Sequence, residues 1–205
     1  MNAEANCFWK IQNRGGQMKI YSHLNLVGFS NCYIIVNEKI HEALIVDPGK
    51  VTTAVIENIE NGGYKLAGIL VSHNHGSHVQ GLASLRKIYT PQIYAADWEV
   101  AKQETNILKG DGVFQAAGLD VEYFSVPGHT ADSMVYKIGN VFFTGDCLFA
   151  GTIGSTIAKF LERMLVKNIK TKILSQSDEN IIMPGHGPPT TVGAEREFNT
   201  YLRDV

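Results

Sequence analysis

The sequence predicts an α/β (α+β) fold, and two observations lead to this prediction. Short runs rich in β-branched and aromatic residues alternate with segments of helical apolar periodicity in both halves of the 205-residue chain. No proline-rich or serine-rich linker interrupts the alternation, which favours a single domain over residues 18–205. Residues 1–17 are polar and contain glycine, so we expect a poorly ordered extension there.

In the first half, the expected strands are short apolar runs that cover residues 18–26, 31–38, 42–46, 66–71 and 92–95. The run LAGILV at 66–71 is wholly apolar, which is typical of a central strand that is buried on both faces. Helices are expected over 51–63, where a Gly-Gly pair ends the apolar periodicity, over 78–89 and from about Asp97.

In the second half, we expect a glycine-containing connection over residues 109–120. Three strands should follow, at 121–126, 133–138 and 140–146. A helix from about Thr156 would have Ser155 as its N-cap. A last strand at 180–185 should lead to a final helix over about 194–205.

Composition excludes several classes of protein. The formal net charge is −2, so there is no basic footprint for nucleic acid or for an anionic membrane. No apolar run approaches the ~20 residues of a membrane-spanning helix, and the start of the chain lacks the apolar segment of a signal peptide. The three cysteines, Cys7, Cys32 and Cys147, do not form a disulfide framework. We therefore expect a cytoplasmic protein with a small-molecule partner, and the sequence leaves its oligomeric state open.

Five of the seven histidines directly follow predicted strands. His73, His75 and His78 follow LAGILV within the stretch SHNHGSH, while His129 lies in the loop PGHT and His186 in the loop GHGP. In α/β sheets, ligands bind in the loops at the carboxyl ends of the strands. We therefore expect these five imidazoles to converge on one cleft.

One acid follows the same pattern, because Asp146 ends the strand NVFFTGD. Imidazole and carboxylate ligands together suit Zn²⁺, Fe or Mn²⁺. The spacing His73-x-His75 allows two imidazoles of one loop to reach one ion. His78 can turn toward a second ion from the start of the next helix, and the two oxygens of Asp146 could bridge both ions.

The motifs HNHGSH, PGHT, TGDCLF and PGHGP, in this order and spacing, resemble those of the metallo-β-lactamase superfamily. Within it, the chain is most similar to short, single-domain relatives of glyoxalase II (hydroxyacylglutathione hydrolase). NCYIIV and ALIVDPG resemble the opening strands of that family, so the resemblance covers about residues 18–190. It implies a four-layer αββα sandwich of two mixed sheets flanked by helices, with the site along one edge.

The resemblance also divides the candidate metal ligands between two ions that share one carboxylate. The first ion would be bound by His73, His75 and His129, the second by His78 and His186, and both by Asp146. Asp47 would hold the histidine loop from behind.

Ser77 departs from the family's motif H-x-H-x-D-H, since it occupies the position of the acid. In relatives that aspartate binds the second metal and orients the attacking hydroxide, and a neutral hydroxyl is a poor ligand for either role. We therefore expect one firmly held Zn²⁺ and a second that is weakly bound or absent. Ser77 would instead cap the helix that begins near His78, because serine and aspartate cap helices about equally well.

A second departure is the segment FAGTIGST, which lacks the Arg and Asp found at this point in glyoxalase II relatives. The chain also ends before the helical substrate domain of glyoxalase II could begin, so we expect no glutathione specificity. A broad, shallow site should prefer a glutathione thioester over a simple thioester by less than ~100-fold, or ~2.7 kcal/mol.

The remaining histidines and the cysteine beside Asp146 are expected to be structural. His23 and His41 lie outside the ligand loops. Cys147 should point away from its neighbour at an extended strand end and should form a buried, inert thiol.

Three functions remain open on the sequence. The leading one is a metal-dependent hydrolase of a small ester or thioester that acts through metal-bound hydroxide. The second is a mononuclear iron enzyme that resembles the persulfide dioxygenases of the superfamily, with His73, His129 and Asp146 as a facial triad. The third is a non-catalytic metal-binding homologue, for which Ser77 is the support. A nucleic-acid-processing role is not expected, because the chain has no basic arm.

Overall fold

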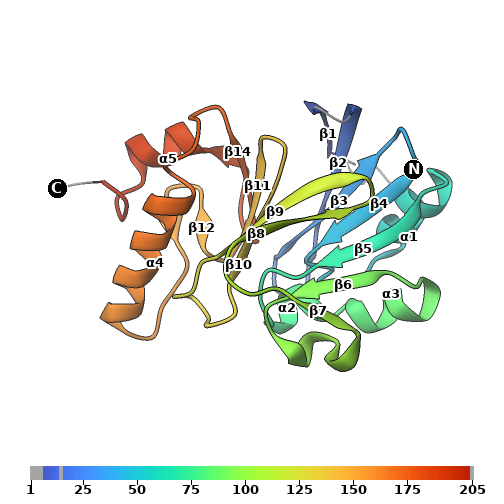
Figure 1. Ribbon diagram of the computed structural model, residues 1–205, viewed down its shortest axis with the longest axis horizontal. Helices are drawn as coiled ribbons and strands as arrows, with labels where there is room; N and C mark the ends of the chain where they lie inside the picture. The colour runs from blue at the N-terminus through green and yellow to red at the C-terminus, as the bar shows by residue number, and fades with distance from the viewer. Residues whose placement is uncertain (1–6, 14–15, 204–205) are drawn as a thin grey trace.

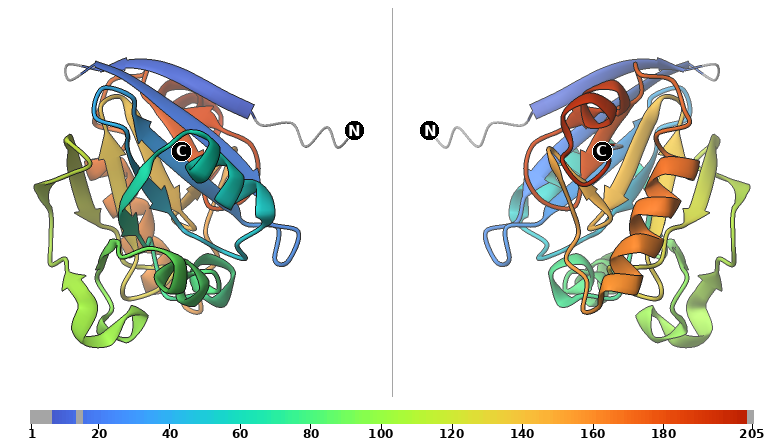
Figure 2. Two further views of the ribbon diagram at one scale, coloured as in Figure 1. Left: turned by 90° about the vertical axis from the view of Figure 1, so that its right-hand side faces the viewer. Right: turned by 90° about the vertical axis from the view of Figure 1, so that its left-hand side faces the viewer.

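The computed structural model describes residues 7–13 and 16–203 and shows two mixed β-sheets packed face to face (Figure 1). Helices α1 and α3 cover the outer face of one sheet, and helices α4 and α5 cover the outer face of the other (Figures 1 and 2). The four-layer αββα sandwich of the prediction is confirmed.

The first sheet has seven strands that follow one another in sequence order. Their bounds are β1 Cys7–Asn13, β2 Gly16–Leu24, β3 Asn31–Asn37, β4 Glu42–Val46, β5 Lys65–Leu70, β6 Gln92–Ala95 and β7 Thr105–Ile107. Strands β1 to β4 are antiparallel and β4 to β7 are parallel. The parallel steps need crossovers. Helix α1 (Thr53–Asn61) connects β4 to β5, and α2 (Gly76–Val79) and α3 (Leu82–Ile88) connect β5 to β6.

The second sheet has six strands in the order β15-β14-β11-β10-β9-β8. Their bounds are β8 Gly112–Ala116, β9 Leu119–Ser125, β10 Met134–Ile138, β11 Val141–Gly145, β14 Ile181–Pro184 and β15 Thr190–Thr191. Only β11 and β14 run parallel among these pairs, and the chain between them contains α4 (Lys159–Lys172). A small ribbon of β12 (Leu148–Phe149) and β13 (Thr152–Ile153) precedes α4, and α5 (Val192–Phe198) follows β15.

Three apolar cores hold the layers together. Strand β3 shows how, because it is buried along its whole length. Tyr33 and Ile35 face the core between the sheets, whereas Ile34 and Val36 face the core under α1 and α3. Strand side chains alternate between faces, so a strand in the middle layer must be apolar on both. The run LAGILV meets the same condition, as predicted.

Three regions differ from the sequence prediction. Residues 7–13 form strand β1 within the segment 1–17 that we expected to be a poorly ordered extension, because CFWKIQN pairs in antiparallel register with β2. Residues 1–6 and 14–15 lie outside the described part. Strand β8 occupies the expected connection at 109–120, where it pairs with β9. The helix expected from Asp97 is two 3₁₀ turns, Trp98–Val100 and Lys102–Glu104, which lead into the edge strand β7.

Helix boundaries differ as well. The helix expected over 78–89 is split at Gly81, whose N–H donates to the Pro48 carbonyl at 3.1 Å. A Cβ at Gly81 would lie 2.1 Å from that carbonyl oxygen, so the chain needs glycine where the two loops meet. Helix α4 begins after Ala158 rather than Ser155, and α5 ends at Phe198 rather than near 205.

No helix in residues 7–13 and 16–203 has both the length and the apolarity to cross a membrane. The longest, α4, has 14 residues and carries charged side chains along its length.

Tyr136 connects the two sheets, which gives a first prediction. Its buried hydroxyl donates to the Val71 carbonyl at 2.7 Å, across the interface from β10 to the end of β5. Tyr136→Phe should lower the free energy of unfolding by about 1–3 kcal/mol, because the Val71 carbonyl loses its partner. Chemical denaturation measures the change, and Tyr201→Phe at a half-exposed position is the matched control. Equal effects of the two substitutions would contradict this role.

Candidate metal centre

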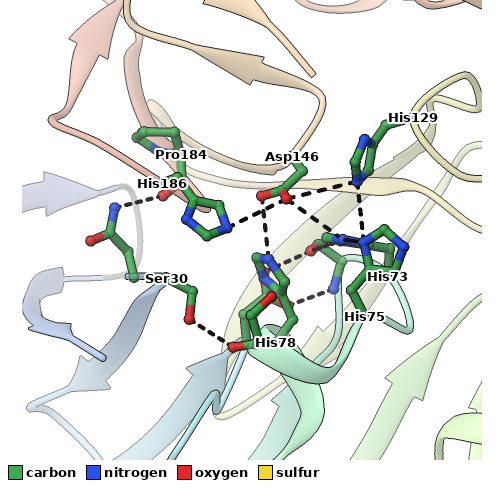
Figure 3. Close-up of polar contacts among 12 residues, drawn as sticks. Ser30, His73, His75, His78, His129, Asp146, Pro184 and His186 are labelled. Atoms are coloured by element: carbon green, nitrogen blue, oxygen red, sulfur yellow. Dashed lines mark hydrogen bonds and ion pairs between the residues drawn. The ribbon is translucent and has the colours of Figure 1, made fainter. Parts of the chain in front are cut away.

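The six side chains predicted as metal ligands lie together at the edge where the two sheets meet (Figure 3). They form two groups whose potential ligand atoms lie within 4.8 Å of one another. The first cluster contains His73, His75, His129 and Asp146, and the second contains His78, Asp146 and His186. The six side chains therefore converge at one place, as expected.

Distances within the first cluster fit a tetrahedral ion. His75 Nδ1 lies 2.9 Å from His73 Nε2 and 3.3 Å from His129 Nε2. Asp146 Oδ2 lies 3.8 Å from His73 Nε2 and 3.7 Å from His129 Nε2. Around zinc with bonds of ~2.0–2.1 Å, tetrahedral ligand atoms are about 3.3 Å apart. Small adjustments of these side chains would therefore accommodate such an ion.

In the second cluster, two buried polar atoms have no hydrogen bond. His78 Nε2 and Asp146 Oδ1 face each other at 3.3 Å, and neither has a hydrogen-bond partner within the described residues. His186 Nε2 lies 3.5 Å from Asp146 Oδ2. A buried polar atom without a partner costs about 1–3 kcal/mol, so an arrangement of this kind calls for an explanation. A bound cation provides one, since it would satisfy both atoms.

Outer hydrogen bonds fix which ring nitrogen faces the centre. Ser72 Oγ donates to Asp47 Oδ2 at 2.6 Å, so His73 Nδ1–H donates to Ser72 Oγ at 3.0 Å. His78 Nδ1–H donates to Asp47 Oδ2 at 3.0 Å. Each ring that uses its Nδ1 proton in this way, when neutral, presents an unprotonated Nε2 to the centre.

Backbone carbonyls do the same for two further rings. His129 Nδ1–H donates to the Ser155 carbonyl at 2.8 Å, and His186 Nδ1–H donates to the Phe29 carbonyl at 3.0 Å. His75 is different, because its Nδ1 faces the cluster and its ring is exposed. The carbonyl partners were not predicted, since a backbone acceptor leaves no mark in the sequence.

Asp47 lies behind the histidine loop, as the family resemblance implied. It is buried, and it accepts from the Ser72 N–H at 2.7 Å as well as from the Ser72 hydroxyl and His78. Its backbone is in the left-handed region at φ +50°, a conformation that aspartate and asparagine tolerate better than most residues.

The loop that carries His186 is held against β3. Tyr33 Oη donates to the Pro184 carbonyl at 2.7 Å, and Asn31 Nδ2 donates to the same oxygen at 3.0 Å. A Cβ at Gly185 would lie 2.4 Å from Asp146 Oδ1, so only glycine allows the loop to approach the shared carboxylate this closely.

Charge distribution differs between the two clusters. Burial and the neighbouring His78 lower the pKa of His73 to about 4. Burial alone would lower the pKa of His78, but Asp47 and Asp146 outweigh it and raise that pKa to about 10. Burial would raise the pKa of Asp146, but the neighbouring His186 and His78 rings hold it well below its usual range. The two carboxylates therefore favour a proton on His78.

Ser77 is not the N-cap that we predicted. It is the second residue of α2, and the N-cap position belongs to His75, whose side chain makes no capping hydrogen bond. Position 77 is fixed through its backbone, because Ser30 Oγ donates to the Ser77 carbonyl at 2.7 Å. A neutral side chain at this position is thus not explained by helix capping.

The residues expected to be structural lie outside the two clusters. Cys147 is buried, its Sγ contacts the Val126 carbonyl at 3.6 Å, and burial raises the pKa of its thiol. His23 Nε2 lies 2.9 Å from Asn58 Nδ2, and His41 stacks on Tyr64.

Comparison with known proteins agrees with this fold. The family model described as the metallo-beta-lactamase superfamily matches residues 25–197, and the chain belongs to that superfamily. Hydroxyacylglutathione hydrolase GloC of Haemophilus influenzae is 30% identical, with 84% of this chain and 92% of that protein covered.

Two solved structures show the same fold. The crystal structure of the BLEG-1 B3 metallo-β-lactamase has a TM-score of 0.78 at 24% identity, covering 97% of this chain and 100% of that one. The structure of TTHA1623 in a di-iron-bound form has a TM-score of 0.65 at 22% identity, covering 95% and 100%.

Asp47→Asn tests the outer hydrogen bonds. Asparagine tolerates the left-handed backbone, but its one acceptor oxygen cannot serve all three donors, the Ser72 N–H, the Ser72 hydroxyl and His78, which share the two oxygens of the carboxylate. We expect the affinity of the second cluster for Zn²⁺ to fall by about 10–100-fold, because the His78 ring loses its fixed tautomer. Calorimetric titration measures this change. Asp120→Asn, at an exposed residue that accepts from Gln115 at 3.1 Å, is the control. Unchanged affinity in Asp47→Asn would show that Asp47 does not orient the ring.

The pKa of His78 predicts how metal binding depends on pH. An ion at His78 Nε2 must displace a proton whose pKa is about 10, so affinity falls as pH falls and rises as pH approaches that value. One displaced proton corresponds to about a tenfold change in affinity per pH unit. Chelator competition between pH 6 and 9 gives the slope. An affinity for the second ion that does not vary with pH in this range would rule out a protonated His78.

Proposed function

We propose that the protein is a metal-dependent hydrolase of a small ester or thioester substrate. The observation that carries this proposal is the convergence of five imidazoles and Asp146, with outer hydrogen bonds that direct four Nε2 atoms inward. A divalent metal held there would act as a Lewis acid and lower the pKa of water toward ~7. The buried Cys147, with its raised thiol pKa, is not suited to act as a nucleophile instead.

The two clusters differ in the ligands they offer. The first has three imidazoles, the usual protein ligand set of a catalytic zinc that keeps its fourth position for water, and it also offers an oxygen of Asp146. The second has two imidazoles and shares the Asp146 carboxylate with the first. Ser77 is neutral and adds no charge to it. We therefore propose a firmly held first Zn²⁺ and a weak second one.

The substrate class follows in part from the relatives. The Haemophilus influenzae relative is named a hydroxyacylglutathione hydrolase, and this chain covers 92% of its length. A further helical domain is therefore not required for the activity that this name states. The absence of such a domain consequently gives no ground to expect a lack of glutathione specificity. One reason for that expectation remains, because residues 150–158 carry no charged side chain to pair with the carboxylates of glutathione.

Iron is the alternative metal. His73, His129 and Asp146 offer two imidazoles and a carboxylate to one ion without any need for residue 77, which suits an oxygen-activating iron site. TTHA1623, which shares the fold, was solved with two irons. Elemental analysis of protein prepared without chelator, together with oxygen consumption on a persulfide, separates the two functions.

We place this activity in the cytoplasm, with a small molecule as the partner. Cys32 and Cys147 are unpaired and buried, which is compatible with a reducing compartment.

Hydrolysis of matched thioesters tests the proposal. The zinc-loaded protein should cleave a simple aryl thioester and a hydroxyacyl glutathione thioester with kcat/KM values within ~100-fold of each other, or ~2.7 kcal/mol. The His129→Ala variant, which lacks a ligand of the first cluster, should lose both activities together. A glutathione preference above that limit would contradict the broad site, and no turnover of either compound would contradict the hydrolase.

Ser77→Asp should strengthen the second cluster. A carboxylate at position 77 would give the second ion the negative charge that it lacks, so affinity for that ion and the rate of ester hydrolysis should both rise. Ser77→Asn has nearly the same shape without the charge and should do neither. Metal stoichiometry and esterase rate at matched free zinc distinguish the variants. If the serine form already holds two tight ions, the charge argument is wrong. If Ser77→Asp gains metal without activity, the iron and non-catalytic alternatives gain support.

A further inference from the structure

His75 differs from the other four ligand histidines in how its ring is held. Each of the others donates its outer ring N–H to a fixed acceptor, namely Ser72, Asp47 or a backbone carbonyl. For His75, both hydrogen-bond contacts of the ring found among residues 7–13 and 16–203 lie inside the cluster, to His73 and His129. The residue is exposed, and the rings that it contacts edge-on, those of His73 and His129, also belong to the cluster.

The peptide before His75 is held instead. The backbone N–H of Asn74 donates to Asp132 Oδ2 at 2.8 Å. On the other side, Asn74 Nδ2 donates to Asp97 Oδ2 at 2.8 Å. Asn74 stands between two ligands of the first cluster, so these two carboxylates fix the chain at the point where the His75 ring departs from it.

Asp132 belongs to the loop that supplies the third imidazole, three residues beyond His129. The Val126 N–H donates to the Ser133 carbonyl at 2.8 Å and closes that loop, and the Met134 N–H donates to the Ser72 carbonyl at 2.8 Å. One carboxylate therefore connects the two loops that provide all three imidazoles of the first cluster.

We propose that Asp132 is a positioning residue, which fixes the peptide between His73 and Asn74 and thereby sets the direction of the His75 ring. The hydrogen bond from the Asn74 N–H to Asp132 holds the backbone one residue before His75, where the ring itself has no outer acceptor. This inference rests on the proposed metal binding but not on the proposed reaction.

Three substitutions separate geometry from charge. Asp132→Ala removes the acceptor, Asp132→Glu keeps the charge but changes its reach, and Asp132→Asn keeps an acceptor oxygen at the same reach without the charge. Titration with Co²⁺, which reports coordination through its visible spectrum, measures the first cluster directly. We expect Asp132→Ala and Asp132→Glu to weaken the first ion by about 10–100-fold and to change the spectrum, with Asp132→Asn near the parent protein.

A second measurement needs no metal. In the metal-free protein, the Asn74 amide should exchange with solvent faster in Asp132→Ala than in the parent or in Asp132→Asn, because its hydrogen bond is lost. Asp120→Ala, which removes an exposed acid of strand β9, is the control for both measurements. Thermal unfolding identifies any variant that has lost its fold, and the two conservative variants then carry the test.

Two results would overturn the proposal. One is an Asp132→Ala protein with unchanged Co²⁺ affinity and spectrum. The other is an Asp132→Asn protein as impaired as Asp132→Ala, which would mean that charge rather than the hydrogen bond matters. If the parent protein binds Co²⁺ but hydrolyses no ester, the proposed function fails while this test still stands. If it binds no metal at all, both proposals about the cluster fail.

Discussion

The centre depends on the hydrogen bonds that the buried Asp47 carboxylate accepts. Its charge is buried at the end of β4, so it must be satisfied by hydrogen bonds, and the donors available are the Ser72 N–H, the Ser72 hydroxyl and His78. Satisfying the acid therefore orders the histidine loop, since its donors belong to the residues that carry or precede the ligands. The burial of the Asp47 carboxylate thus determines how the Nε2 lone pairs of His73 and His78 are directed.

The packing of the two sheets positions the rest of the site. The first sheet delivers the loop after β5, and the second delivers the loop after β9, the turn at Asp146 and the loop of His186. Tyr136 and Tyr33 hydrogen-bond across the interface to backbone carbonyls beside these loops. Packing of the sheets therefore fixes the distance between ligands that lie far apart in the chain.

Sequence reasoning found the six candidate ligands because their residue types are unusual at strand ends and because alternating apolar runs locate those ends. The prediction was wrong where a local structure depends on a contact with a segment that the sequence pattern does not identify. Gly81 splits a helix only because Pro48 approaches it, and β8 is a strand only because β9 lies beside it. The acceptors of Phe29 and Ser155 are backbone atoms, which any residue would provide. Ser77 was assigned to a cap that His75 occupies, since the helix starts earlier than its apolar pattern.

Asp146 has one further consequence. Its Oδ1 faces His78 and its Oδ2 faces His73, His129 and His186, so a single negative charge lies between the two clusters. An ion on one side draws that charge toward itself and repels a second dication only a few ångströms away. We therefore expect the two clusters to bind metal ions with negative cooperativity. The first cluster, which has three imidazoles, should be occupied before the second, which has two. At limiting metal, such a protein would populate a half-loaded state across a wide range of concentrations, where independent sites would give a statistical mixture.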